Sequence, residues 1–242
     1  MTLLVNILAL FAFSVKGLAG FGPGLFIVPL LSLFIPLKEV IPYTALLLFF
    51  ANLPMLWLVR KGLALRRDLP AALYYALGIV LGTRLLLALP EAQLKFALGL
   101  VLLIFAAWTL LRLPSPSAPP PLDRAEQLRL AAVTLSGGLL VGALGAGALP
   151  VFIYLPLRYP PKEMRALFTS VFAVGTLAWT LANWQAGLLT GELARLALQT
   201  LPGMLAGLWF GAWLYGRLPH RGRVRAVALL LLPAALKLMG VF

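Results

Sequence analysis

Two glycine-broken apolar stretches decide the fold of this chain: KGLAGFGPGLFIVPLL (Lys16–Leu31) and VGALGAGALPVFIYLPL (Val141–Leu157). Apolar segments precede both, at Leu3–Val15 and Leu128–Val141. At a helical rise of 1.5 Å per residue, each piece beside the glycines spans only about 15–20 Å, whereas the hydrocarbon core of a bilayer is about 30 Å thick. Each region is therefore predicted to be a pair of half-length helices meeting at a glycine break. Such a break is tolerated in a membrane only where protein or a water-filled cavity surrounds it.

The composition places the rest of the chain in the membrane as well. Of 242 residues, 62% are hydrophobic and 11% charged, and the mean hydropathy is +1.00, whereas a soluble domain carries about 25% charged residues. The net charge of +13 comes from basic residues between apolar segments, which argues against nucleic-acid binding. Six stretches are predicted to span the bilayer, namely Ile41–Val59, Leu69–Leu89, Leu94–Leu111, Leu167–Gln185, Leu196–Leu214 and Val224–Phe242.

The two halves of the chain repeat one another. Gly17, Gly20 and Gly22 correspond to Gly142, Gly145 and Gly147 at a spacing of 125, and Gly78, Gly82 and Pro90 correspond to Gly207, Gly211 and Pro219 at a spacing of 129. A proline-rich stretch separates the halves and is typical of an extended linker. The predicted organisation is a first repeat at 1–112, a linker at 113–125 and a second repeat at 126–242.

Charge predicts that the repeats are inverted. The segment after the first full span holds Arg60, Lys61, Arg66 and Arg67, while its counterpart holds only Arg195; the next segment holds Lys95, while its counterpart holds Arg217, Arg221, Arg223 and Arg225. Basic segments favour the cytoplasmic side. The predicted fold is an all-α integral membrane protein of two inverted-topology repeats, each a broken or re-entrant helix pair plus three full transmembrane helices, with both termini outside.

Broken helices in inverted repeats indicate a binding site at the membrane midplane. The helix starts near Leu25 and Leu149 would each present about half a positive charge and several free N–H groups, which favours a small anion. The alternative is that the glycines only allow close helix packing. Lys16 and Arg84 are cations in apolar surroundings that either contact the anion or extend toward the interface. Asn52 and Asn183 are either ligands or contacts between helices.

The two glycine stretches, together with MRALFTSVF (Met164–Phe172), resemble the sulfite exporter TauE/SafE family over essentially the whole chain. The resemblance implies a multi-pass exporter of sulfite or organosulfonates in the cytoplasmic (inner) membrane of a bacterial or archaeal cell. The motif positions it implies are Gly20, Gly22, Gly24, Gly145, Gly147, Thr169 and Ser170. Thr44 is the positional partner of Thr169, although such hydroxyls can equally bond their own helix. Ala146, Ala148 and Pro23 stand where the family often has glycine, which leaves the identity of the anion open.

The expected ligands are a small anion and the lipid bilayer, with no cofactor, metal or nucleic acid, and a homodimer is left open. No acidic residue falls at mid-span and His220 lies in a basic segment, so a proton relay within the membrane is not expected. The membrane potential is the expected driving force. An intramembrane enzyme is disfavoured because the chain lacks cysteine and a carboxylate pair within its spans. A non-transporting scaffold subunit or an anion channel would also be compatible with these patterns.

Overall fold

The computed structural model describes residues 2–19, 23–59, 64–111, 120–146, 148–215, 232–233 and 235–240. These residues form nine helices, α1 (Thr2–Ala19), α2 (Gly24–Ser32), α3 (Leu37–Val59), α4 (Leu65–Ala88), α5 (Glu91–Leu111), α6 (Arg124–Leu144), α7 (Leu149–Arg158), α8 (Pro161–Gln185) and α9 (Gly191–Tyr215). A further helical turn covers 235–238. Within the described part of the chain, α4, α5, α6 and α8 are long and apolar enough to cross a bilayer. The predicted all-α membrane fold is confirmed.

The order of helix lengths repeats along the chain. A long helix, a short helix and then long helices follow one another from α1 to α5, and the same order returns from α6 to α9. Most of the predicted last span, Val224–Phe242, lies outside the described residues. Its described part packs on α5, because a Cβ atom added to Gly99 would lie 2.6 Å from Cγ of Met239. This packing gives α5 a neighbour from the end of the second repeat.

Helices α1, α3 and α9 run in one direction. On α1 and α9, Asn6 lies against Gly203 and Leu10 lies against Gly207, so residue numbers increase together. On α1 and α3, Val5 shares a small pocket with Tyr43 near their starts. Lys16 then contacts Asn52 farther along. The three helices are therefore parallel.

Helices α4, α6 and α8 run in the opposite direction. Gly78 and Gly82 of α4 approach the backbone of Leu135 and Leu139 of α6, respectively, so α4 and α6 are parallel. Arg67 contacts Glu163 and Tyr75 contacts Gly175, so α4 and α8 are parallel too. These helices run antiparallel to α3. The end of α6 lies at the start of α3, where Gly145 contacts Ile41. Farther along α3, Asn52 contacts Thr176 in the middle of α8 and not at its end. Equivalent helices thus point in opposite directions, as inverted repeats require.

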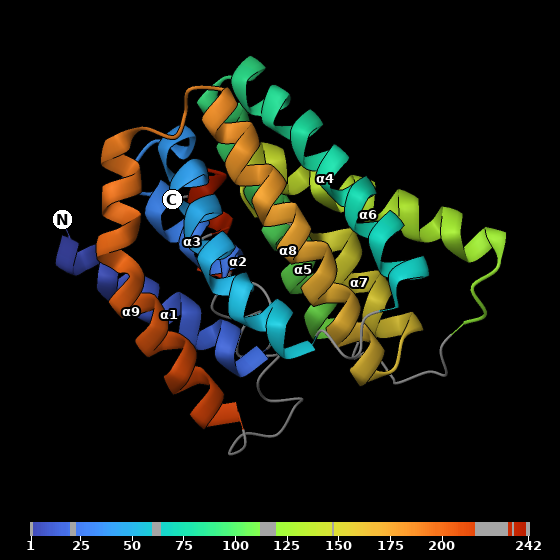
Figure 1. Cartoon of the computed structure of the whole chain (residues 1–242). Helices are drawn as coiled ribbons and strands as arrows, with labels where there is room; N and C mark the ends of the chain where they lie inside the picture. Colours follow the sequence, from blue (N-terminus) through green and yellow to red (C-terminus); the bar gives the residue numbers. More distant parts are fainter. Residues whose placement is uncertain are drawn as a thin grey trace.

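The most extensive helix contacts also follow the repeat. Helix α1 lies beside α9, and α6, the counterpart of α1, lies beside α4, the counterpart of α9 (Figure 1). Glycines let these backbones touch. A Cβ added to Gly82 would lie 2.2 Å from the carbonyl oxygen of Leu139, and one added to Gly142 would lie 2.2 Å from that of Ile79. Such distances leave no room for a side chain. The packing role considered for the glycines therefore holds for Gly142, which lies inside α6.

The first helix of each broken pair is longer than predicted. Helix α1 has 18 residues and α6 has 21, whereas α2 and α7 have 9 and 10. Hydropathy placed the start of α6 near Leu128, but Asp123 caps it earlier, its carboxylate accepting a hydrogen bond from the Glu126 N–H at 2.7 Å. At its other end α6 continues through Gly142 to Leu144. Among the nine helices from α1 to α9, only α2 and α7 are half-length.

Candidate functional site

A cavity of about 70 Å³ lies where the two helix breaks meet. The breaks are in contact, since a Cβ added to Gly24 would lie 3.2 Å from the carbonyl oxygen of Gly145. A single water needs roughly 10–15 Å³ by a comparable measure, so this cavity can hold a small ligand. Its walls come from α1, from the starts of α2 and α7, from the end of α6, and from the middle of α3, α4 and α8.

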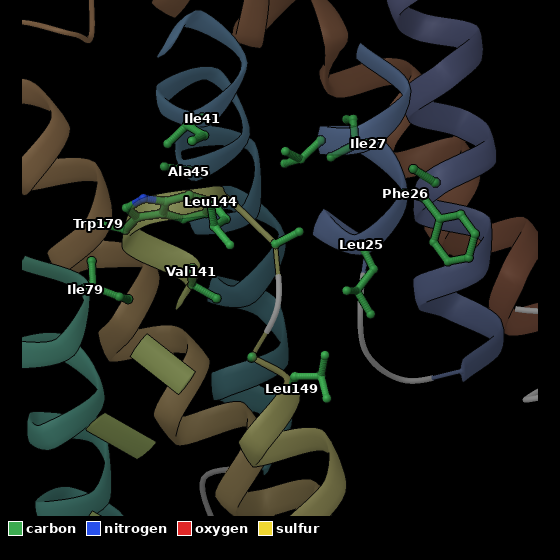
Figure 2. Packing of buried hydrophobic residues seen from close by; sticks show 14 of the residues in the cluster. Leu25, Phe26, Ile27, Ile41, Ala45, Ile79, Val141, Leu144, Leu149 and Trp179 are labelled. Carbon is green, nitrogen blue, oxygen red and sulfur yellow. The ribbon is translucent and has the colours of Figure 1, made fainter. Parts of the chain in front are cut away.

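Both short helices begin at the cavity. Pro23, Gly24 and Leu25 at the start of α2 line it, and so does Ala148 just before α7. Figure 2 shows Leu25 and Leu149 facing the same space, with α2 and α7 leading away from it in opposite directions. No described side chain caps either start. The first N–H groups of both helices therefore have no partner within their helix, and both carry the positive end of a helix dipole.

Gly145 ends α6 and turns the chain toward α7. Its φ angle of 73° lies in the left-handed region, and its N–H donates to the carbonyl oxygen of Val141 at 2.8 Å. Glycine adopts this conformation without strain. The packing around this position also requires glycine, because a Cβ atom here would lie 2.7 Å from Cγ1 of Ile41. The backbone can therefore come close to anything held in the cavity.

Lys16 supplies the positive side chain of the cavity. It is 5% exposed, and its Nζ donates to Oδ1 of Asn52 at 2.7 Å. The Asn52 Nδ2 in turn donates to Oγ1 of Thr176 at 3.3 Å and to the carbonyl oxygen of Phe172 at 3.4 Å. This chain of bonds fixes the amide with its oxygen toward the ammonium group. An ammonium group has three donors, so Lys16 can still donate to a ligand.

The structure brings four of the predicted site residues together. Lys16, Gly24, Gly145 and Thr169 all line the cavity, although they come from four different parts of the chain. Gly20, Gly22 and Gly147 lie outside the described residues. The four residues lie together because the two helix breaks are in contact.

Three other predicted residues do not line the cavity. Ser170 is buried, and its Oγ donates to the carbonyl oxygen of Leu167 at 3.0 Å, so its hydroxyl bonds its own helix. Thr44 is fully buried, and its Oγ1 has no hydrogen-bond partner among the described residues. Arg84 is exposed on α4. The geometry therefore favours no ligand contact for Arg84.

The sequence singled out none of Thr176, Tyr75 and Trp179, all of which line the cavity. Trp179 is completely buried, and none of the described residues accepts a hydrogen bond from its indole N–H. Thr176 lies seven residues after Thr169, two turns along the same face of α8, and this spacing is the signal that could have found it. Tyr75 and Trp179 look like any large apolar residue of a span, and no local pattern separates them.

The wall of the cavity toward the starts of α4 and α8 is aromatic. The ring centroids of Phe168 and Phe172 lie 5.5 Å apart, and each lies 5.6 Å from that of Phe152. Tyr75 packs edge-on against Phe172 with its ring centroid 5.5 Å away. The described acidic side chains are elsewhere, in the first turns of helices or just before them. The described cavity wall therefore combines one cation and hydrogen-bond donors with an apolar surface.

Inverted repeats with paired helix breaks that meet at a cavity are typical of secondary transporters, and they place this chain among multi-pass membrane transporters. The family comparison agrees. The chain belongs to the sulfite exporter TauE/SafE family, whose model matches residues 5–238. No curated protein and no solved structure shows significant similarity to this chain.

Proposed function

We propose that this protein exports small sulfur-containing oxyanions, sulfite or organosulfonates, across the cytoplasmic membrane. The observation that carries the proposal is the meeting of two uncapped helix starts and the buried Lys16 in one cavity. Each helix start contributes about half a positive charge, and Lys16 adds one more. A buried positive site of this kind is stabilised by an anion that compensates its charge.

The hydrogen-bonding groups point to an oxyanion among possible anions. Lys16 has donors left after its bond to Asn52, and the N–H groups that open α2 and α7 are also donors. The oxygen atoms of sulfite and sulfonate groups accept such bonds and carry no ammonium group that would need a carboxylate partner. None of the described lining residues is acidic. We therefore expect zwitterionic aminosulfonates such as taurine to bind less well than sulfoacetate.

The membrane orientation is a second part of the proposal. Helices α3 and α9 end at the same face, and each is followed by a basic segment, Arg60–Arg67 and Arg217–Arg225 respectively. We propose that this face is cytoplasmic, because basic segments are retained there. Both termini would then lie outside. An anion leaving the cytoplasm moves down an inside-negative potential and gains about 2.3 kcal/mol per charge per 100 mV.

The purified protein in proteoliposomes tests the proposal. Sulfite, sulfate, sulfoacetate, taurine and simple carboxylates are first screened for thermal stabilisation, because a ligand that binds the folded state stabilises it. Flux of the best binder is then measured with an imposed potential and, separately, with an imposed pH gradient. We expect saturable flux that follows the potential. Flux that follows only the pH gradient, or no stabilisation by any oxyanion, would contradict the proposal.

A further inference from the structure

A network of charged and phenolic side chains closes one end of the second repeat. Glu126 of α6 is 1% exposed. Its Oε1 accepts hydrogen bonds from the hydroxyls of Tyr154 at 2.8 Å and Tyr159 at 2.9 Å, and its Oε2 accepts one from Arg158 at 3.1 Å. A buried carboxylate with this many donors is well compensated. These bonds tie the end of α7 to the start of α6.

Arg67 extends the network to two more helices. Its Nε donates to Asp68 at 2.8 Å, and one of its terminal nitrogens donates to Glu163 at 2.8 Å. The guanidinium also lies over the ring of Tyr159, 5.2 Å from the centroid, a distance typical of a cation–π interaction. The starts of α4, α6 and α8 and the end of α7 are thus held together at one face of the membrane.

The aromatic wall lies between this network and the cavity. Along α8, Glu163 belongs to the network, Phe168 and Phe172 follow in the aromatic wall, and Thr176 lies at the cavity. Along α7 the order is the same in reverse, from the cavity through Phe152 to the network. A ligand in the cavity is therefore separated from this face by two layers, one aromatic and one ionic.

The corresponding positions at the opposite face do not carry the arginine and tyrosine of this network. At the spacing of 124 seen for Glu39 and Glu163, Tyr159 corresponds to Ile35, and at the spacing of 129 Arg67 corresponds to Leu196. Ile35, Glu39 and Leu196 line a pocket of about 30 Å³ whose other described walls are mainly apolar. Glu163 thus has a counterpart in Glu39, whereas the counterparts of Tyr159 and Arg67 are apolar.

We propose that the Glu126–Arg67 network is the gate at the face where α4, α6 and α8 begin, and that the apolar counterparts of Tyr159 and Arg67 make the opposite face the easier one to open. In inverted repeats the two halves exchange their conformations when access alternates. Bonds formed at only one of the two faces therefore favour one of the two states. The inference rests on the chain being a transporter and not on which anion it carries.

The chain contains no cysteine, so a single introduced cysteine reports access to the cavity. Leu48→Cys places the thiol in the cavity wall without touching the network. Its labelling by a membrane-impermeant maleimide is measured from each face, in inside-out and right-side-out vesicles. With the network intact we expect slow labelling from the network face and faster labelling from the opposite face.

Adding Glu126→Gln is expected to raise the labelling rate from the network face on the order of tenfold, while Glu39→Gln, which removes the counterpart of Glu163 at the opposite face, leaves it unaltered. Tyr159→Phe removes one hydroxyl but keeps the ring, and it decides the question if Glu126→Gln does not fold. Unchanged labelling from the network face in these variants, or an equal increase in Glu39→Gln, overturns the gate. Since labelling needs no substrate, this result is independent of the proposed sulfur oxyanion.

Discussion

The role of a single residue in this protein depends on partners that are distant in the sequence. Lys16 is unusual in sequence because no acidic residue is near it, and this isolation made it a candidate site residue; in the structure it lines the cavity. Its partner Asn52 lies 36 residues away, and the sequence left open whether that amide is a ligand or a contact between helices. The structure shows the contact between helices, because Asn52 bridges α1 to α8, and it also places the amide in the cavity wall. No spacing rule within one helix could have paired them.

Replacing Lys16 by methionine is expected to weaken anion binding about 10- to 100-fold. A hydrogen bond to a charged group contributes about 1.5–3 kcal/mol, and each 1.4 kcal/mol is a factor of ten in affinity. Methionine fills similar space, so the fold should persist. Binding is measured by the thermal-shift response to sulfite or sulfoacetate.

The matched control for Lys16→Met is Arg84→Met, which removes a cation that is exposed and outside the cavity. We expect its anion response to equal that of the unmodified protein. A loss of response in Arg84→Met as large as that in Lys16→Met would show that the assay senses overall charge and not the site.

Whole helices were easier to predict than their ends. Five of the six spans predicted from hydropathy coincide with described helices, but α3, α5, α8 and α9 all begin three to six residues earlier than predicted. Their first turns contain Glu39, Glu91, Glu163 and Glu192. Acidic residues stabilise a helix start by interaction with its dipole, while the same residues lower hydropathy. Hydropathy therefore places the start of a helix too late, because the acidic residues that stabilise the first turn are not apolar.

The glycines were also easier to predict as a group than one by one. Sequence spacing identified Gly142, Gly145 and Gly147 as one group, yet Gly142 packs inside α6 and Gly145 ends it. What distinguishes them is the neighbour each faces, the backbone of Ile79 or the side chain of Ile41. Those neighbours come from the first repeat, so only the assembled structure assigns the roles.

At the level of helix pairs, we expect Gly82→Ala to destabilise the protein by roughly 1–3 kcal/mol or more. The added methyl group would meet the backbone of α6 at 2.2 Å, and crowding of a packed interface typically costs about that much. The melting temperature of detergent-purified protein should fall clearly. The control is Gly191→Ala at the start of α9, where nothing lies within 4 Å of an added Cβ. A drop of equal size in both variants would mean that helix contact at Gly82 is looser than described.

At the scale of the whole molecule, the inverted arrangement followed from charge and glycine spacing because both are properties of the entire chain. The directions of α1, α3 and α9 against α4, α6 and α8 agree with it. What could not be predicted is which residues come together in the gate network. The gate network depends on Tyr154, Arg158 and Tyr159 converging on Glu126, which lies about thirty residues earlier on another helix. Nothing in the repeat pattern distinguishes this cluster from ordinary interfacial residues.

The proposed orientation predicts which segments an external reagent reaches. Ser115→Cys places a thiol in the linker, which follows α5, and Thr190→Cys places one between α8 and α9. Because α5 and α8 end at opposite faces, an impermeant maleimide added to intact cells should label Thr190→Cys and spare Ser115→Cys. Permeabilised cells serve as the control in which both are labelled. The reverse pattern would place both termini in the cytoplasm and reject the orientation.

The coupling of transport to the membrane potential depends on the charge of the whole cargo, and this gives a quantitative test. A uniporter that reaches equilibrium at 100 mV gains about 2.3 kcal/mol per charge, which corresponds to about a 50-fold concentration ratio for a monoanion. A dianion gains twice this energy and squares the ratio. Methanesulfonate and sulfoacetate, with one and two charges at neutral pH, can therefore be compared in proteoliposomes held at a series of potentials. The logarithm of the ratio for sulfoacetate should rise twice as steeply with potential as that for methanesulfonate, and liposomes without protein should show neither slope. Equal slopes would require a co-transported cation with the dianion, and the acidic residues kept at the helix starts would then be the first places to look for its site.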